Sequence, residues 1–191
     1  PVVTLGVSLK MYFGYQQTLQ WCRSIATLLE REPSIRNGQV QVFVIPSFPM
    51  LAPALEIFEG LALVGAQNLF WEDKGAYTGE VSPEVLKEMG CNVVEIGHAE
   101  RRRYFAESDR QIADKTAAAW RNGLIPVLCI GEDRQCLPAE AARLCAQQLT
   151  AALDRAQGAG LSGDLVVAYE PQWAIGAVQP ASPQYIGAVC T

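Results

Sequence analysis

Three side chains of this sequence could act together on a carbon-bound proton beside a carbonyl group. Lys10 lies shortly after the apolar run VVTLGV, His98 follows NVVEIG, and Glu170 follows LVVAY. A carboxylate can remove the proton, an imidazole can exchange protons with the carbonyl and hydroxyl oxygens, and an ammonium can stabilise the negative charge that develops. The residue types therefore predict proton abstraction next to a carbonyl.

His98 is the only histidine among 191 residues. A lone histidine is commonly structural or solvated, but acid–base chemistry near neutral pH uses histidine most readily. Gly97 allows the backbone to turn just before it, at the end of an apolar run. We predict a functional role for His98, whereas Glu100 and the arginines 101–103 are expected to form ion pairs or a charged helix start.

Glu170 ends an apolar run, and Pro171 prevents that run from continuing as a strand. A capping or ion-paired carboxylate is the alternative interpretation. The apolar residues 173–175 precede Gly176 and would be exposed unless the segment folds over a ligand. This composition favours a loop that closes over a bound molecule. Lys10 could be an ordinary solvated lysine, and only its position at the same strand end supports a role in binding an anion.

Short apolar runs alternate with helical segments along the whole chain. Near-continuous apolar strands are typical of parallel strands covered on both faces, and their alternation with helices predicts an α/β fold. An open doubly wound sheet and a (β/α)8 barrel both place ligands at the carboxyl ends of the strands. The predicted strands are residues 2–7, 40–45, 61–66, 92–97, 125–130 and 165–169.

Capping residues mark several helix boundaries. The signals are Ser82 and Pro83 before a helix that Gly90 ends, a capping box of Ser108 and Gln111 before a helix to Asn122, and an alanine-rich helix over 139–156.

Composition argues against several classes of protein. The net charge of −5 and the lack of a basic run disfavour nucleic-acid binding. The loop SLKMYFG has no G-x-G-x-x-G, which disfavours a dinucleotide site. Six scattered cysteines without C-x-x-C indicate reduced thiols, and one histidine makes a zinc site unexpected. With no signal segment and no apolar stretch near roughly 20 residues, we expect a cytoplasmic protein without membrane contact.

Six segments in order resemble the triosephosphate isomerase family. They are SLKM (8–11), GAQN (65–68), GAYTGEVSPEVLKEMG (75–90), IGHAERR (96–102), PVLCIGE (126–132) and YEPQWAIG (169–176). The resemblance implies a (β/α)8 TIM barrel without a cofactor. It also implies isomerisation of glyceraldehyde 3-phosphate and dihydroxyacetone phosphate, a place in glycolysis and gluconeogenesis, and a homodimer that docks through residues 68–78.

The resemblance also assigns roles to single residues. Lys10 would bind the substrate, His98 would be a neutral electrophile, Glu170 the proton acceptor, and the Gly176 N–H a phosphate ligand. These roles are the general assignment of the family.

Several positions depart from the family pattern and predict a different substrate. Ser8 replaces an Asn whose amide contacts the substrate, so Ser8 is expected to bind the sugar and to leave space for a larger one. A tetrose phosphate such as an erythrulose phosphate is therefore the alternative to a triose phosphate. The other departures are Leu9, Tyr12, Ala99, Gln172, Ala177 and Val178.

A barrel of this kind needs roughly 250 residues, and this sequence reaches Thr191. We expect a single TIM-barrel domain over residues 1–191 that is incomplete after about six βα units and lacks the glycine-rich phosphate loops. It would be a fragment or a truncated gene product, poorly folded and inactive by itself. A catalytically silent barrel or a binding protein is the competing function.

Overall fold

A computed structural model describes residues 3–191, and its six strands form one parallel sheet in chain order. All neighbouring pairs are parallel, as predicted; the predicted strand residue Val2 lies outside the described residues. The strands are β1 (Val3–Ser8), β2 (Val40–Ile45), β3 (Leu63–Ala66), β4 (Val93–Ile96), β5 (Ile125–Ile130) and β6 (Val166–Tyr169).

Helices connect successive strands, and the predicted caps form. Ser82 Oγ accepts the Val85 N–H at 3.2 Å, Gly90 has φ +102°, and Ser108 makes the capping box with Gln111. Within residues 3–191 no helix combines the length and the apolar character that a membrane span requires. The helices are α1 (Tyr15–Arg31), α2 (Pro33–Arg36), η1 (Phe48–Met50), α3 (Leu51–Ile57), α4 (Pro83–Met89), α5 (Ala99–Phe105), α6 (Asp109–Arg121), α7 (Pro138–Gly158), η2 (Gln172–Ala174) and α8 (Pro183–Cys190).

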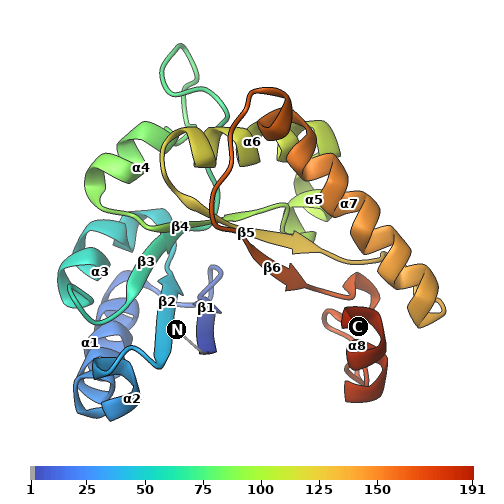
Figure 1. The fold of residues 1–191 in the computed structure, drawn as a ribbon. Coiled ribbons are helices and arrows are strands. Elements are labelled where there is room, and N and C mark those ends of the chain that lie inside the picture. Colours follow the sequence, from blue (N-terminus) through green and yellow to red (C-terminus); the bar gives the residue numbers. More distant parts are fainter. Residues whose placement is uncertain (1–2) are drawn as a thin grey trace.

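The sheet curls into an open half-barrel with the helices outside it (Figure 1). Its strand order has no reversal, which a doubly wound sheet would require. Alternate side chains of the strands face opposite sides. Val44, Val94 and Leu128 join the core beneath the helices, whereas Phe43 and Val127 belong to a second cluster on the inner face. The expected TIM-barrel fold is confirmed, with six of its strands.

Close packing on the inner face requires a glycine in β1. A Cβ added to Gly6 would lie 1.9 Å from Cζ of Phe43, so the phenyl ring occupies the space that a side chain would need. The ring fills the interior where β1 passes β2. Ser8 is the next residue of β1 on the same face, because side chains alternate along a strand.

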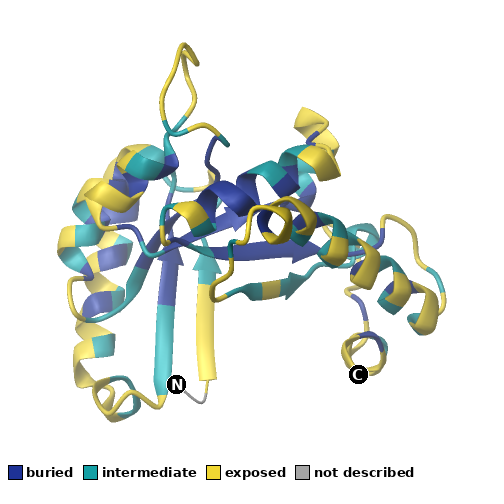
Figure 2. Ribbon diagram, turned by 45° about the horizontal axis from the view of Figure 1, so that its top comes forward, coloured by how far each residue is buried: buried dark blue, intermediate teal, exposed yellow. Residues whose placement is uncertain are grey.

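The two outer strands of the half-barrel are partly uncovered. Within residues 3–191, β1 pairs with β2 alone and β6 with β5 alone. Leu5 is 57% exposed and Val167 is 45% exposed, and β1 is drawn as largely exposed in Figure 2. The cover on both faces that is typical of parallel strands is therefore incomplete at these two edges, as expected for a barrel that is incomplete after about six βα units.

Candidate active site

Lys10, His98 and Glu170 meet at the carboxyl ends of β1, β4 and β6. The Lys10 ammonium contacts Nε2 of His98, and the same Nε2 lies 3.2 Å from Oε1 of Glu170. The imidazole is buried, with 5% of the residue exposed. The structure thus brings together the three residues that the sequence placed at separate strand ends; their catalytic roles remain predictions.

The backbone at Lys10 is strained. Its φ is +53°, in the left-handed region that a residue with a Cβ rarely adopts. The Gln67 amide donates to the carbonyl oxygen of Lys10 at 2.9 Å and to that of Ile45 at 3.4 Å. Such strain persists only where surrounding contacts hold it, and it concentrates at functional sites. Gln67 is one supporting residue that the sequence interpretation did not identify, although it lies in the GAQN segment.

His98 is the N-cap of α5, and this position determines which ring nitrogen carries the proton. Gly97, with φ +72°, turns the chain out of β4. Nδ1 of His98 then accepts the backbone N–H of Glu100 at 3.2 Å. A neutral imidazole has one donor and one acceptor nitrogen, so an accepting Nδ1 leaves the proton on Nε2. The N–H of a neutral His98 therefore points toward the Glu170 carboxylate, which can accept it, whereas the Lys10 ammonium has only donors.

The charges of His98 and Glu170 are coupled. Burial lowers the pKa of His98, but the Glu170 carboxylate outweighs it and the net shift is upward. Burial raises the pKa of Glu170, while its contact with His98 and the nearby Lys10 lower it, with a net shift downward. The Glu100 amide opposes protonation of Nδ1 because an imidazolium has no acceptor nitrogen. Separation of Glu170 from the ring would remove the largest influence that raises the pKa of His98 and would favour the neutral imidazole.

A close approach between two strand ends positions Glu170. The N–H of Glu170 donates to the carbonyl oxygen of Ile130 at 2.8 Å. A Cβ added to Gly131 would lie 1.9 Å from the carbonyl oxygen of Glu170, so only glycine fits there. The Ala99 amide lies 3.5 Å from Oε2 of the same carboxylate. Gly131 and the start of α5 together fix where the carboxylate lies.

Glu132 is a buried carboxylate beneath the expected closing loop, and the sequence interpretation gave it no role. It is 1% exposed and accepts hydrogen bonds from the Tyr169 hydroxyl, from Trp173 Nε1 at 2.7 Å and from the Tyr185 hydroxyl at 2.8 Å. Burial and then the bond to Glu132 raise the pKa of Tyr185 to about 12. The carboxylate thus joins β6, η2 and α8. Its signal in the sequence was an acid directly after an apolar strand and Gly131.

Glu95 is a second carboxylate that the sequence interpretation missed. It is buried on β4, and its Oε2 accepts the hydroxyl of Ser8 at 2.9 Å. Burial raises its pKa, and the neighbouring Lys10 opposes that shift. Ligand-type atoms of Glu95, His98 and Glu170 all lie within 4.8 Å of one another, close enough to approach a cation. The Lys10 ammonium already provides positive charge at that position.

The three reactive side chains line a cavity of about 400 Å³. Its walls include Lys10, Tyr12, His98, Glu170 and Ile175. Gly176, the expected phosphate ligand, directly follows Ile175. It is exposed and has φ +73°.

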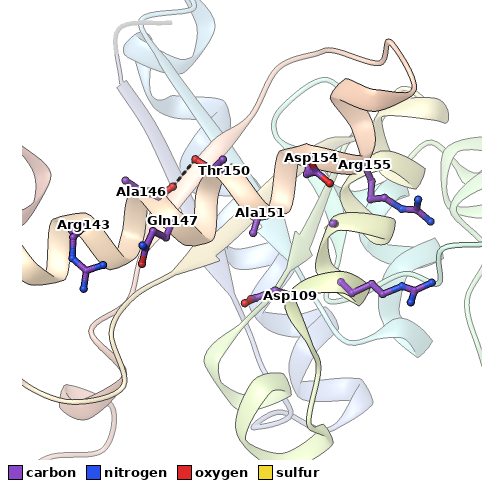
Figure 3. Close-up of a pocket in the computed structure, with 10 residues that line it drawn as sticks. Asp109, Arg143, Ala146, Gln147, Thr150, Ala151, Asp154 and Arg155 are labelled. Carbon is purple, nitrogen blue, oxygen red and sulfur yellow. Dashed lines mark hydrogen bonds between the residues drawn. The ribbon is translucent and has the colours of Figure 1, made fainter.

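A larger hollow of about 790 Å³ lies outside the barrel between α6 and α7 (Figure 3). Its lining includes Ala113, Ala146 and Ala151, and its charged side chains are spread along the groove. One of them, Arg155, is paired with Asp114 at 2.7 Å. Because no reactive groups converge there, the smaller cavity is the candidate active site.

The curled parallel sheet, with a lysine, a histidine and a glutamate at its carboxyl edge, defines an α/β-barrel enzyme with an acid–base site. The family profile described as triosephosphate isomerase matches residues 3–191. The chain belongs to the triosephosphate isomerase family.

Individual relatives agree with this membership. An L-erythrulose-1-phosphate isomerase of Pectobacterium atrosepticum is 58% identical over 98% of this chain and 73% of its own length. A triosephosphate isomerase of Moorella thermoacetica is 42% identical over 86% of this chain and 66% of its own length. The crystal structure of triosephosphate isomerase from Bartonella henselae superposes with a TM-score of 0.78 at 30% identity, over 99% of this chain and 73% of that one.

Proposed function

We propose that the protein is an aldose–ketose isomerase for a small phosphorylated sugar. The observation that carries this proposal is the contact of one imidazole nitrogen with both an ammonium and a carboxylate, with Nε2 of His98 3.2 Å from Oε1 of Glu170. These groups supply a base, a hydrogen-bond donor and a positive charge at one cavity, which is what proton transfer between adjacent carbons requires.

Each group has a defined task in the proposed reaction. A substrate carbonyl oxygen enters beside Nε2 of His98 and separates the ring from Glu170. The Glu170 carboxylate then removes a proton from the adjacent carbon, and the N–H of His98 donates to the oxygen as negative charge develops on it. The Lys10 ammonium stabilises the resulting enediolate, and the N–H of Gly176 binds the phosphate. His98 gives its Nε2 proton to the former carbonyl oxygen and takes up the proton of the neighbouring hydroxyl, so that a carbonyl forms at the other carbon. Glu170 returns its proton to the former carbonyl carbon, which completes the isomerisation.

A four-carbon sugar phosphate is the substrate we favour, ahead of the triose phosphate that the family name suggests. The relative that is 58% identical is an L-erythrulose-1-phosphate isomerase, whereas the triosephosphate isomerase of Moorella thermoacetica is 42% identical. Tyr12, which lines the cavity, also differs from the usual residue of the family. A role in glycolysis and gluconeogenesis would instead need a preference for trioses.

The experiment compares turnover of L-erythrulose 1-phosphate and dihydroxyacetone phosphate. It uses the protein itself and a chimera in which residues 1–191 are followed by the unmatched carboxyl-terminal part of the Pectobacterium atrosepticum relative. A higher kcat/KM for the tetrose supports the proposal, and a higher value for the triose refutes the substrate preference. A folded chimera that turns over neither sugar would favour the competing class, a silent barrel or a binding protein.

A homodimer in the cytoplasm is part of the same proposal. The loop from Asn68 to Thr78 projects from the body of the molecule (Figures 1 and 2), and its residues 74–78 are exposed. An exposed protruding segment is suited to contact with a second copy. Sedimentation of the chimera tests this, since deletion of residues 74–78 should convert a dimer into a monomer.

A further inference from the structure

Ser8 and Glu95 contact each other across the interior of the half-barrel. They lie on β1 and β4, which are not neighbours in the sheet, yet the Ser8 hydroxyl donates to Oε2 of Glu95 at 2.9 Å. Val93, two residues before Glu95, belongs to the inner cluster, so Glu95 faces inward as well. The hydrogen bond therefore connects two strands that the sheet itself does not hold together.

The Ser8 hydroxyl is engaged away from the substrate. A serine hydroxyl has one proton to donate, and Ser8 gives it to Glu95. The described residues that line the active-site cavity include Lys10 and His98 but not Ser8. Residue 8 therefore lies behind the residues that a sugar phosphate would touch.

Glu95 is close enough to transmit an effect to the reactive groups. Its carboxylate and the ligand-type atoms of His98 and Glu170 lie within 4.8 Å of one another. It is 6% exposed, so solvent screens it weakly. Its negative charge raises the pKa of His98, which is also faced by the charges of Lys10, Glu100 and Glu170. The position of this carboxylate therefore affects both the ammonium and the imidazole.

We propose that Ser8 is a positioning residue, which holds the Glu95 carboxylate against Lys10 and His98 and acts on catalysis without touching the sugar. The kinetic part of this inference rests on the proposed isomerase function. It replaces the expected direct contact of Ser8 with the substrate by an indirect one. Loss of the hydroxyl should then lower kcat for a triose and a tetrose alike, whereas loss of a substrate contact would raise KM or change the ratio between the two sugars.

A direct test reads the pKa of His98 by NMR, which is unambiguous because the sequence has one histidine. Glu95→Gln should lower this pKa, because a negative charge that favours the imidazolium is lost. Ser8→Ala should shift it in the same direction by a smaller amount, and should cause no further shift in the Glu95→Gln background. Ser8→Thr keeps the hydroxyl and serves as the matched control, with a pKa equal to that of the parent.

Kinetics provide the second readout, on the chimera described above. Ser8→Ala should lower kcat by roughly 10-fold, as expected when a hydrogen bond to a charged group is lost, with KM within about twofold for both sugars. An equal pKa shift from Ser8→Ala with and without Glu95, no shift at all, or a defect confined to KM would overturn the proposal. If Ser8→Ala does not fold, Ser8→Cys, a weaker donor, replaces it. The NMR result requires no turnover, so it stands even if the isomerase proposal fails.

Discussion

Replacement of Glu170 by glutamine tests the proposed mechanism at its base. The amide keeps the size of the side chain and removes its basicity. We expect kcat to fall by about 10² to 10⁴, the usual contribution of a positioned general base, while KM changes little because the amide still fills the space beside His98. The Lys10 and His98 contacts with the substrate should remain.

The same substitution should lower the pKa of His98. The interaction energy that is lost follows from the 3.2 Å separation of His98 Nε2 from Glu170 Oε1. Coulomb's law gives about 1.3 kcal/mol at this distance in a dielectric near 80 and about 5 kcal/mol in one near 20. The smaller figure is the scale of the free energy by which the carboxylate favours the imidazolium over the neutral ring. Because the Glu170 side chain is only 25% exposed, its removal should lower the pKa of His98 and favour the neutral imidazole.

The assay combines steady-state kinetics with an NMR titration of His98 in the parent and in Glu170→Gln. Glu59→Gln removes the same charge from an exposed position in the turn after α3 and is the control; it should leave both quantities unchanged. A kcat within a few-fold of the parent would remove Glu170 from the mechanism. An unchanged or increased His98 pKa would show that the carboxylate does not govern the charge of the ring.

Three further predictions concern the site and the sheet. His98→Asn should lower kcat with little change in KM, because a donor to developing charge acts mainly in the transition state; a defect in KM alone would make His98 a binding residue. Gly131→Ala should lower both kcat and the melting temperature, since its Cβ would meet the Glu170 carbonyl oxygen at 1.9 Å; parent-like values would contradict the close approach. The Glu170–His98 pair should stabilise the fold most between about pH 4.5 and pH 6.5, because the effect is lost as the pH rises through the raised pKa of His98 and as it falls through the lowered pKa of Glu170. Urea unfolding of the parent and of Glu170→Gln should therefore differ most in this window. A difference that grows as the pH rises above about 6.5 would refute the sign.

The strands could be predicted because parallel strands under helices are apolar along their whole length. Each predicted run produced a strand that differs from it by at most a few residues at an end. The helix caps could be predicted because their partners are close in the sequence. Ser108 and Gln111 are three residues apart and form hydrogen bonds with each other. The helix predicted over 139–156 extends over Pro138–Gly158 in the structure, because an alanine-rich segment gives no sharp stop signal before its glycines.

The supporting residues of the site could not be predicted in the same way, because they act across long sequence separations. Ser8 bonds Glu95 and Gln67 bonds the carbonyl of Lys10, and in each case the partners meet only after the sheet has curled. An acid within an apolar strand, as at Glu95, indicates that something unusual lies inside, but it does not indicate the partner. The family resemblance placed Lys10, His98 and Glu170, whereas the contacts that orient them required coordinates.

The position of the site makes its geometry depend on the two least protected strands. Lys10 follows β1 and Glu170 follows β6, the strands that have one neighbour each within residues 3–191. Their reactive groups are connected through His98, which lies on neither strand. Unpaired strand edges and exposed apolar side chains such as Leu5 and Val167 destabilise such strands relative to the central ones. Fraying of either edge would therefore separate the ammonium from the carboxylate before the core beneath the helices is lost. For residues 1–191 by themselves, we accordingly expect the loss of isomerase activity to precede global unfolding, and added strands beside β1 and β6 to restore it.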